Sequence, residues 1–66
     1  MTINGCDSCI IGTDNTRYVY CYDKLVAHFQ KKFGDYIEAV EWVEINIIGA
    51  YYGKETPIII KLFKNN

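Results

Sequence analysis

The chain has 66 residues, which we expect to form a single domain over 1–66 near the lower size limit for independent folding, because so short a chain buries only about 60% of its unfolded surface. Half of its residues are hydrophobic, and its formal net charge is −1 with a pI of about 5.6. This balance argues against a dedicated nucleic-acid binder, which needs clustered Lys and Arg, and no apolar run reaches the ~20 residues that span a bilayer. We therefore expect no membrane partner, no nucleic acid and a cytoplasmic location.

The first part of the chain, 1–16, predicts a loop with one short strand. It combines Gly, Asn and Asp, which favour turns, with a short apolar pair at Ile10 and Ile11. The next segment, 17–22, is β-branched and aromatic and alternates along its length, which predicts a strand.

The alternation along this strand places three tyrosines on one face: Tyr18, Tyr20 and Tyr22. Val19 and Cys21 share the opposite face, and we expect this smaller face to point to the core. The tyrosines can then pack against the domain with their hydroxyls reaching water, or they can form a recognition surface for a partner. If they form a recognition surface, Tyr20→Ala should weaken partner binding and leave folding intact.

Two helices are predicted in the middle of the chain, 24–33 and 36–50, and they are close enough in sequence to form an αα-hairpin. Asp23 is expected to cap the first helix and Gly34 to end it. Asp35 is expected to cap the second helix, because its carboxylate can accept hydrogen bonds from the N–H groups of the first turn.

Apolar residues in the second helix recur at spacings of three and four and predict one buried stripe. The stripe consists of Tyr36, Ala39, Val40, Val43, Ile47 and Ala50. Ile37, Ile45 and Ile48 fall outside it. Either the helix is covered on more than one side, or these isoleucines form an exposed apolar strip for a partner or a dimer mate. Asn46 is expected to face the buried side and to tie down either the loop near 53–56 or the start of the chain.

Three carboxylates occupy every third position of the same helix: Glu38, Glu41 and Glu44. Such a row is typical of a solvated helix face. It also offers an electrostatic contact for a basic partner.

The C-terminal segment 58–63 predicts a second main strand that pairs with the first. Its near-continuous apolar run is typical of a strand that is covered on both sides or paired across a homodimer. Lys61 and Lys64 are the kind of charges that protect an open strand edge from aggregation. Together the elements predict an α+β fold in which an αα-hairpin packs on a short antiparallel sheet.

Cys6 and Cys9 form a C-x-x-C pair, and with Cys21 and His28 they supply four candidate zinc ligands. The spacing of the second pair is not that of a zinc knuckle, and the two residues are predicted on a strand and within a helix. We favour free thiols that fill small spaces in a reducing cytoplasm, so no metal and no cofactor are expected. No Ser or Cys is clearly placed beside His28 as a nucleophile, so the sequence predicts a protein that is not an enzyme.

Four motifs follow one another along the chain: G-x-D-x-x-I-I-G at 5–12, Y-x-Y-D-K at 20–24, E-A-x-E-W-x-E-x-N-x-x-G-A-Y-x-G at 38–53 and T-P-I at 56–58. Together they resemble a family of short uncharacterised proteins that are encoded mostly by phages and prophages. The resemblance covers roughly 5–60. The family has no assigned catalytic or ligand-binding residues to carry over, and its members do not typically have cysteine at the three positions found here, which counts against a metal site.

This resemblance implies a viral or mobile-element protein that works in the cytoplasm of a bacterial host cell. Small phage proteins of this kind often bind a host protein, including defence nucleases. We therefore hypothesise a non-enzymatic protein that binds a host protein, as an anti-defence inhibitor of the anti-CRISPR type. The alternatives are a small zinc-binding module and an oligomeric sponge for a nucleotide signal. The candidate partner surfaces are the tyrosine face and the acidic helix face.

Overall fold

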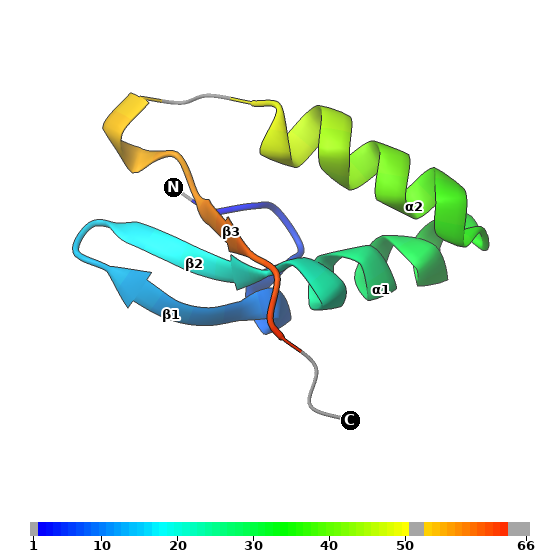
Figure 1. Cartoon of the computed structure of the whole chain (residues 1–66), viewed down its shortest axis with the longest axis horizontal. Coiled ribbons are helices and arrows are strands. Elements are labelled where there is room, and N and C mark those ends of the chain that lie inside the picture. Colours follow the sequence, from blue (N-terminus) through cyan, green and yellow to red (C-terminus); the bar gives the residue numbers. More distant parts are fainter. Residues whose placement is uncertain (1, 51–52, 64–66) are drawn as a thin grey trace.

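The computed structural model describes residues 2–50 and 53–63. It confirms the predicted α+β fold: two helices form a hairpin that packs with a three-stranded sheet of order β1-β2-β3 (Figure 1). Lys64, which was expected to protect the edge of the last strand, lies outside the described residues. In the part of the chain that is described, no helix is long and apolar enough to cross a membrane.

The N-terminal part contains more regular structure than its composition predicts. A 3₁₀ turn, η1 (Asp7–Cys9), leads into β1 (Ile10–Asp14), which pairs antiparallel with β2 (Arg17–Cys21). Asn15 has a φ of 55° in the turn between them. Asn is one of the few residues that adopts this left-handed conformation readily, so the turn closes a β-hairpin.

Helix α1 (Tyr22–Phe33) begins two residues earlier than predicted. Cys21 is its N-cap, so the prediction that Asp23 caps the helix is wrong, as is the extension of the strand to residue 22. Asp23 lies inside the first turn instead, where its negative charge suits the helix dipole. The helix ends as predicted at Gly34, whose φ of 75° allows its N–H to donate to the Gln30 carbonyl at 2.7 Å.

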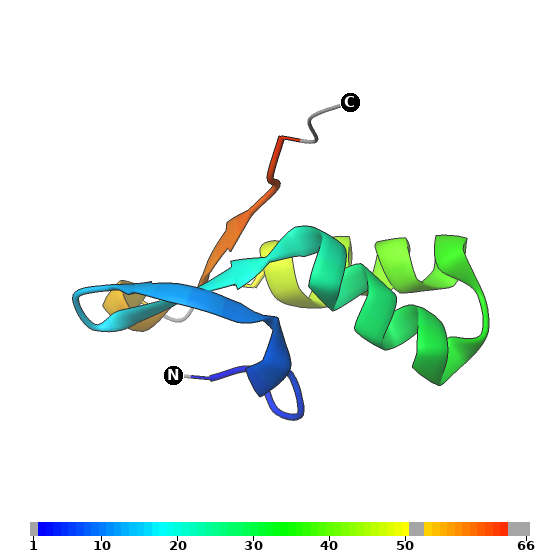
Figure 2. The same cartoon turned by 90° about the horizontal axis from the view of Figure 1, so that it is seen from below.

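Helix α2 (Tyr36–Trp42) continues as a π-helix, η2 (Val43–Ile48). Asp35 caps α2 as predicted, because its Oδ1 accepts a hydrogen bond from the Glu38 N–H at 3.1 Å. The helical stretch ends at Ile48 rather than at residue 50. Figures 1 and 2 show that α1 continues the line of β2 and that α2 returns alongside α1.

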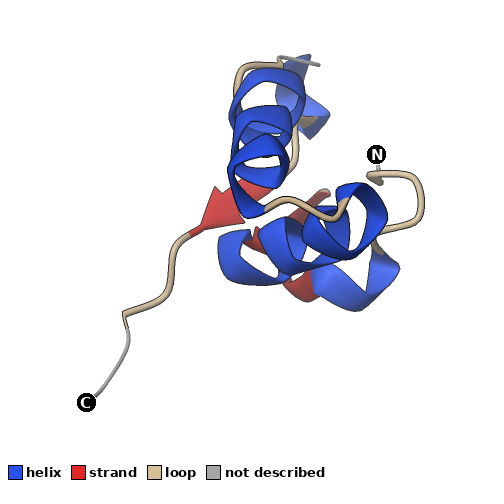
Figure 3. Cartoon of the chain, turned by 90° about the vertical axis from the view of Figure 1, so that its right-hand side faces the viewer, coloured by secondary structure: helices blue, strands red, loops and turns tan. Residues whose placement is uncertain are grey.

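Strand β3 (Ile58–Ile60) follows a 3₁₀ turn, η3 (Gly53–Glu55), and is half as long as predicted. It pairs parallel with β2, with Ile59 opposite Tyr20. The sheet is therefore mixed and not purely antiparallel. The β-hairpin produces the antiparallel pair, whereas the chain passes through both helices before β3, which allows β3 to run in the direction of β2. Figure 3 shows the segment after β3 leading away from the helices.

The core lies between η1, β2, α1 and one side of α2. Its buried residues are Cys6, Cys9, Tyr20, Cys21, Leu25, Val26, Phe29, Ala39 and Val43. The predicted stripe of the second helix is correct in direction, since Ala39 and Val43 are buried, but Tyr36 at its start is exposed. Helix α2 therefore covers one side of the core, and α1 and β2 form the centre of the core.

Candidate functional site

The three tyrosines do not share one exposed face. Tyr20 is fully buried, and its hydroxyl accepts a hydrogen bond from the Ile3 N–H at 2.8 Å. Burial raises the pKa of the Tyr20 hydroxyl. Tyr22 lies on α1, and Tyr18, with 36% of its surface exposed, is the one residue of the three that remains on the outside of β2. The prediction that the three tyrosines form an exposed recognition surface is therefore wrong, because Tyr20 fills the core of this small domain.

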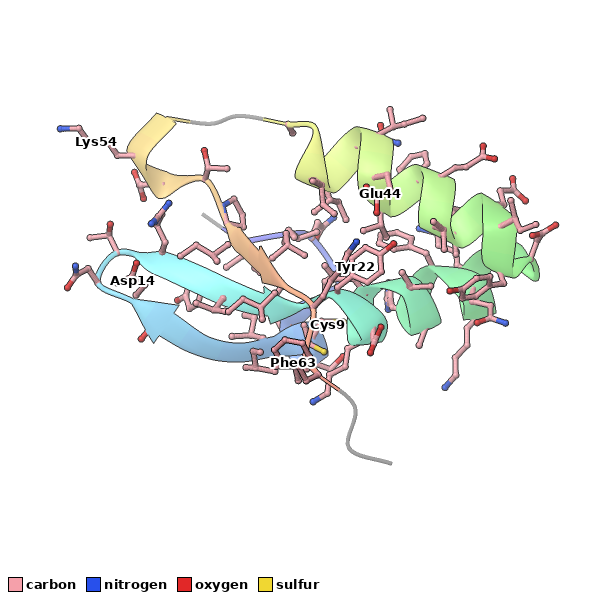
Figure 4. The ribbon with its side chains drawn as sticks, in the orientation of Figure 1. Cys9, Asp14, Tyr22, Glu44, Lys54 and Phe63 are labelled. Atoms are coloured by element: carbon pink, nitrogen blue, oxygen red, sulfur yellow. The ribbon has the colours of Figure 1, made fainter. Side chains whose placement is uncertain are left out.

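Tyr22 instead joins a polar cluster with Glu44 of η2 and Lys61 of the segment after β3. The Tyr22 hydroxyl donates a hydrogen bond to Glu44 Oε2 at 2.9 Å, and Lys61 Nζ lies 4.0 Å from the same oxygen. The Lys61 ammonium also lies over the Tyr22 ring, 4.6 Å from its centroid. Figure 4 shows Tyr22 and Glu44 pointing toward each other. The cluster connects the start of α1, the π-helix and the C-terminal segment.

The electrostatics of this cluster keep the Tyr22 phenol neutral. Burial, the hydrogen bond to Glu44 and the negative charge of Glu44 raise the pKa of Tyr22 to about 12. A phenol with this pKa stays protonated at neutral pH, so Tyr22 can donate a hydrogen bond there but cannot serve as a base. Glu44 is consequently not a free member of an acidic row, because Tyr22 and Lys61 engage it.

The outer face of α2 and η2 carries two exposed isoleucines and two exposed carboxylates. We call this the outer helix face: Ile37, Glu38, Glu41 and Ile45. Ile37 and Ile45 have 67% and 70% of their surfaces exposed. The alternative in which other parts of the chain cover these isoleucines is therefore wrong. The alternative in which they form an exposed apolar strip agrees with their exposure. Trp42 and Ile48 are also partly exposed, at 43% and 41%, and the Trp42 ring packs against Phe29 and Phe33 of α1.

Asn46 lies on the same helical stretch and is also exposed. Its Nδ2 donates to the Trp42 carbonyl at 3.3 Å, within the helix itself. The prediction that Asn46 faces the buried side and ties down the loop near 53–56 or the start of the chain is wrong. The π-helical turn changes the angular spacing of side chains after Val43, so the α-helical period misplaces the residues beyond it.

The candidate zinc ligands do not meet at one point. Cys6, Cys9 and Cys21 are free, buried thiols, and burial, followed by the neighbouring Cys9, raises the pKa of the Cys6 thiol. His28 lies on α1 with its ring edge-on to the Phe29 ring, at 4.9 Å between centroids. Within residues 2–50 and 53–63, no group of three or more His, Cys, Asp or Glu side chains is arranged to hold a metal ion. The structure gives the zinc alternative no support.

A basic hollow beside α1 is a feature that the sequence interpretation missed. One part, of about 290 Å³, is lined by residues of η1 and α1: Ser8, Cys9, Lys24, Ala27, His28 and Lys31. An adjoining part, of about 510 Å³, is lined by Asn4, Gly5, His28, Phe29, Lys31 and Lys32. The spacing of Lys24, His28 and Lys31 at i, i+4 and i+7 is the signal that could have identified it, because these positions share one helix face.

The fold and these surfaces define a small α+β domain with an apolar and acidic helix face on α2 and a basic hollow beside α1. Comparison of the chain with models of known protein families, with curated proteins and with solved structures finds no match.

Proposed function

We propose that this protein acts by binding a host protein through its outer helix face and that it does not catalyse a reaction. The observation that carries the proposal is the exposure of Ile37 in α2 and Ile45 in η2, at 67% and 70% of their surfaces. Burying an isoleucine side chain contributes about 1.5–3 kcal/mol. Large apolar side chains that are left in water together on one helical stretch are candidates for an interaction site.

The chemistry of this face specifies the kind of partner. A helix with apolar anchors two turns apart fits an apolar groove on another protein. The exposed carboxylates of Glu38 and Glu41 flank the anchors, so the groove should be rimmed by Lys or Arg, which would also steer the association. Glu44 contributes less because it is engaged by Tyr22, and Tyr18 on β2 is a secondary candidate contact.

The resemblance to phage and prophage proteins supplies the biological context of the proposal. It supports a protein that works in the cytoplasm of a bacterial host and inhibits a defence factor, such as a nuclease with a basic surface. An enzyme that binds nucleic acid carries clustered Lys and Arg, and the acidic outer helix face would complement such a surface.

The test is photo-crosslinking in bacterial cells with a crosslinking amino acid at position 45, followed by binding measurements with the purified partner. We expect a discrete crosslinked protein, and we expect Ile37→Ser/Ile45→Ser to weaken its binding on the order of 10- to 100-fold, since buried anchors dominate interface energies.

The matched control is Ile11→Ser on β1, where Ile11 is 40% exposed and lies away from α2. This variant should bind as the wild type does. Retention of full affinity by the double variant, or an equal loss in the Ile11→Ser control, would contradict the proposal.

Self-association is a second candidate role, for a different surface. β3 is at the edge of the sheet, and the chain after it exposes Leu62 at 52% and Phe63 at 101%. An apolar strand edge in water tends to pair with another strand. We propose that a second copy of the chain covers this edge, as a two-fold symmetric homodimer.

A further inference from the structure

We propose that the basic hollow beside α1 binds the phosphate groups of a small polyphosphate-bearing molecule, such as a nucleoside triphosphate. The hollow lies on α1 and η1, whereas the outer helix face lies on α2 and η2. The proposal is thus independent of the host partner, and either can fail alone.

Positive charge converges on the hollow. Lys24, His28 and Lys31 line one face of α1, and Lys32 lines the adjoining part. The two ion pairs between described residues, Arg17–Asp14 and Lys61–Glu44, involve none of these three lysines. Ammonium groups one or two turns apart on a helix repel one another, and an anion with several charges would relieve that repulsion.

The N-terminal turn provides polar groups opposite the helix. Asn4 and Ser8 can donate hydrogen bonds from their side chains to phosphate oxygens. The His28 ring is held edge-on against Phe29, with an angle of 89° between the ring planes, so its orientation is set before a ligand arrives. The hollow therefore combines charge with hydrogen-bond donors from two separate segments, as a phosphate site requires.

The size and surroundings of the hollow favour a short polyphosphate over a nucleic acid. From Lys24 to Lys32 the helix rises by about 12 Å, which matches only three or four phosphates of a single strand. Asp7 of η1 and Asp23 beside Lys24 adjoin the hollow along the chain, and further carboxylates lie on α2. A long polyanion that extends past the hollow would meet more of these acidic residues than a short one does.

The test is a nuclear magnetic resonance titration of the full chain with inorganic tripolyphosphate, ATP, adenosine and a single-stranded oligonucleotide. Tripolyphosphate and ATP should shift the amide signals of residues 4–9 and 24–32, and adenosine should not. Added salt should weaken both interactions. Tighter binding of ATP than of tripolyphosphate would identify a nucleotide as the ligand, and equal binding would identify the polyphosphate group alone.

Lys31→Gln is the informative variant, because Lys31 lines both parts of the hollow, and its effect should be a two- to fivefold loss of affinity, roughly as for one exposed ion pair. Lys54→Gln is the control, since Lys54 is an exposed lysine of η3 and lies at the other end of β2 from Cys9, which lines the hollow (Figure 4). An equal loss in both variants, the absence of shifts at millimolar tripolyphosphate, or tighter binding of the oligonucleotide would overturn the proposal.

Discussion

At the residue scale, Tyr20 ties the N-terminal loop to the centre of the sheet. Its ring is fully buried, and its hydroxyl accepts the Ile3 N–H. We expect Tyr20→Phe to lower the free energy of unfolding by about 1–2 kcal/mol, because the Ile3 N–H loses its partner. Tyr20→Ala should cost about 3–5 kcal/mol through the cavity that it leaves.

Urea unfolding followed by circular dichroism measures both effects of the Tyr20 variants. Tyr18→Phe is the control, because Tyr18 is partly exposed on the same strand and should change the stability by less than about 0.5 kcal/mol. Equal stabilities for Tyr20→Phe and the wild type would show that the Ile3 hydrogen bond contributes nothing.

Tyr22 makes the domain sensitive to high pH. Its pKa is raised from the ordinary value of 10.0 to about 12 in the folded chain, so the folded state favours the protonated phenol. The resulting stabilisation is fully present below pH 10 and is lost as the pH rises through 12, because the unfolded chain then releases the proton first. We expect the urea midpoint to fall over this range more steeply in the wild type than in Tyr22→Phe.

Glu44→Gln tests the cause of the raised pKa at Tyr22. Removing the carboxylate charge leaves burial as the main contribution, so the pKa of Tyr22 should move back toward its ordinary value. Ultraviolet titration of the tyrosines, with Glu41→Gln as the exposed control, measures this shift. An unchanged titration in Glu44→Gln would show that the hydrogen bond at 2.9 Å does not persist in solution.

At the element scale, Gly49 ends the π-helix. Its N–H donates to the Glu44 carbonyl at 3.0 Å, five residues back, and a Cβ at this position would lie 2.8 Å from the Ile45 carbonyl oxygen. We expect Gly49→Ala to lower the free energy of unfolding by about 1–3 kcal/mol, because backbone atoms must shift to accept the methyl group.

Thermal unfolding of Gly49→Ala beside Gly12→Ala tests this expectation. A Cβ at Gly12 would meet no atom within 4 Å, so this control should stay within about 0.5 kcal/mol of the wild type. If the two variants are equally stable, the π-helical end does not depend on glycine.

At the scale of the whole molecule, the proposed homodimer has its contact at the edge of the sheet. Native mass spectrometry should detect a dimer of the wild-type chain whose population rises with concentration. Leu62→Ser/Phe63→Ser should shift the population to the monomer, because these side chains supply exposed apolar surface beside β3.

The control for the dimer is Ile37→Ser/Ile45→Ser, which alters the outer helix face and should leave the dimer intact. A monomer at every concentration would remove the homodimer from consideration. Loss of the dimer in this control alone would place the contact between copies on the outer helix face, which would then have to be shared with the proposed host partner.

The end of α1 and the start of α2 show what could be predicted from local sequence. Gly34 ends α1 and Asp35 caps α2, and both act on atoms within four residues of themselves. The α+β class and the helical hairpin could be predicted for the same reason, because they also depend on patterns among residues that are close in sequence. The candidate site was predictable only in part: the row of carboxylates and the isoleucines outside the apolar stripe marked the outer helix face, whereas the tyrosine pattern pointed to a surface that includes a core residue.

The sequence by itself determined where the first helix ends, where the second begins and where their charged residues lie, because caps and helical periodicity depend on near neighbours. Only the tertiary structure decided that Tyr20 is buried, that β3 runs parallel to β2, and that the last helical turns are π-helical. The burial of Tyr20 and the direction of β3 depend on packing between segments far apart in the chain. In a domain of this size a few large side chains must fill the core, and which face of a strand supplies them depends on what packs against it.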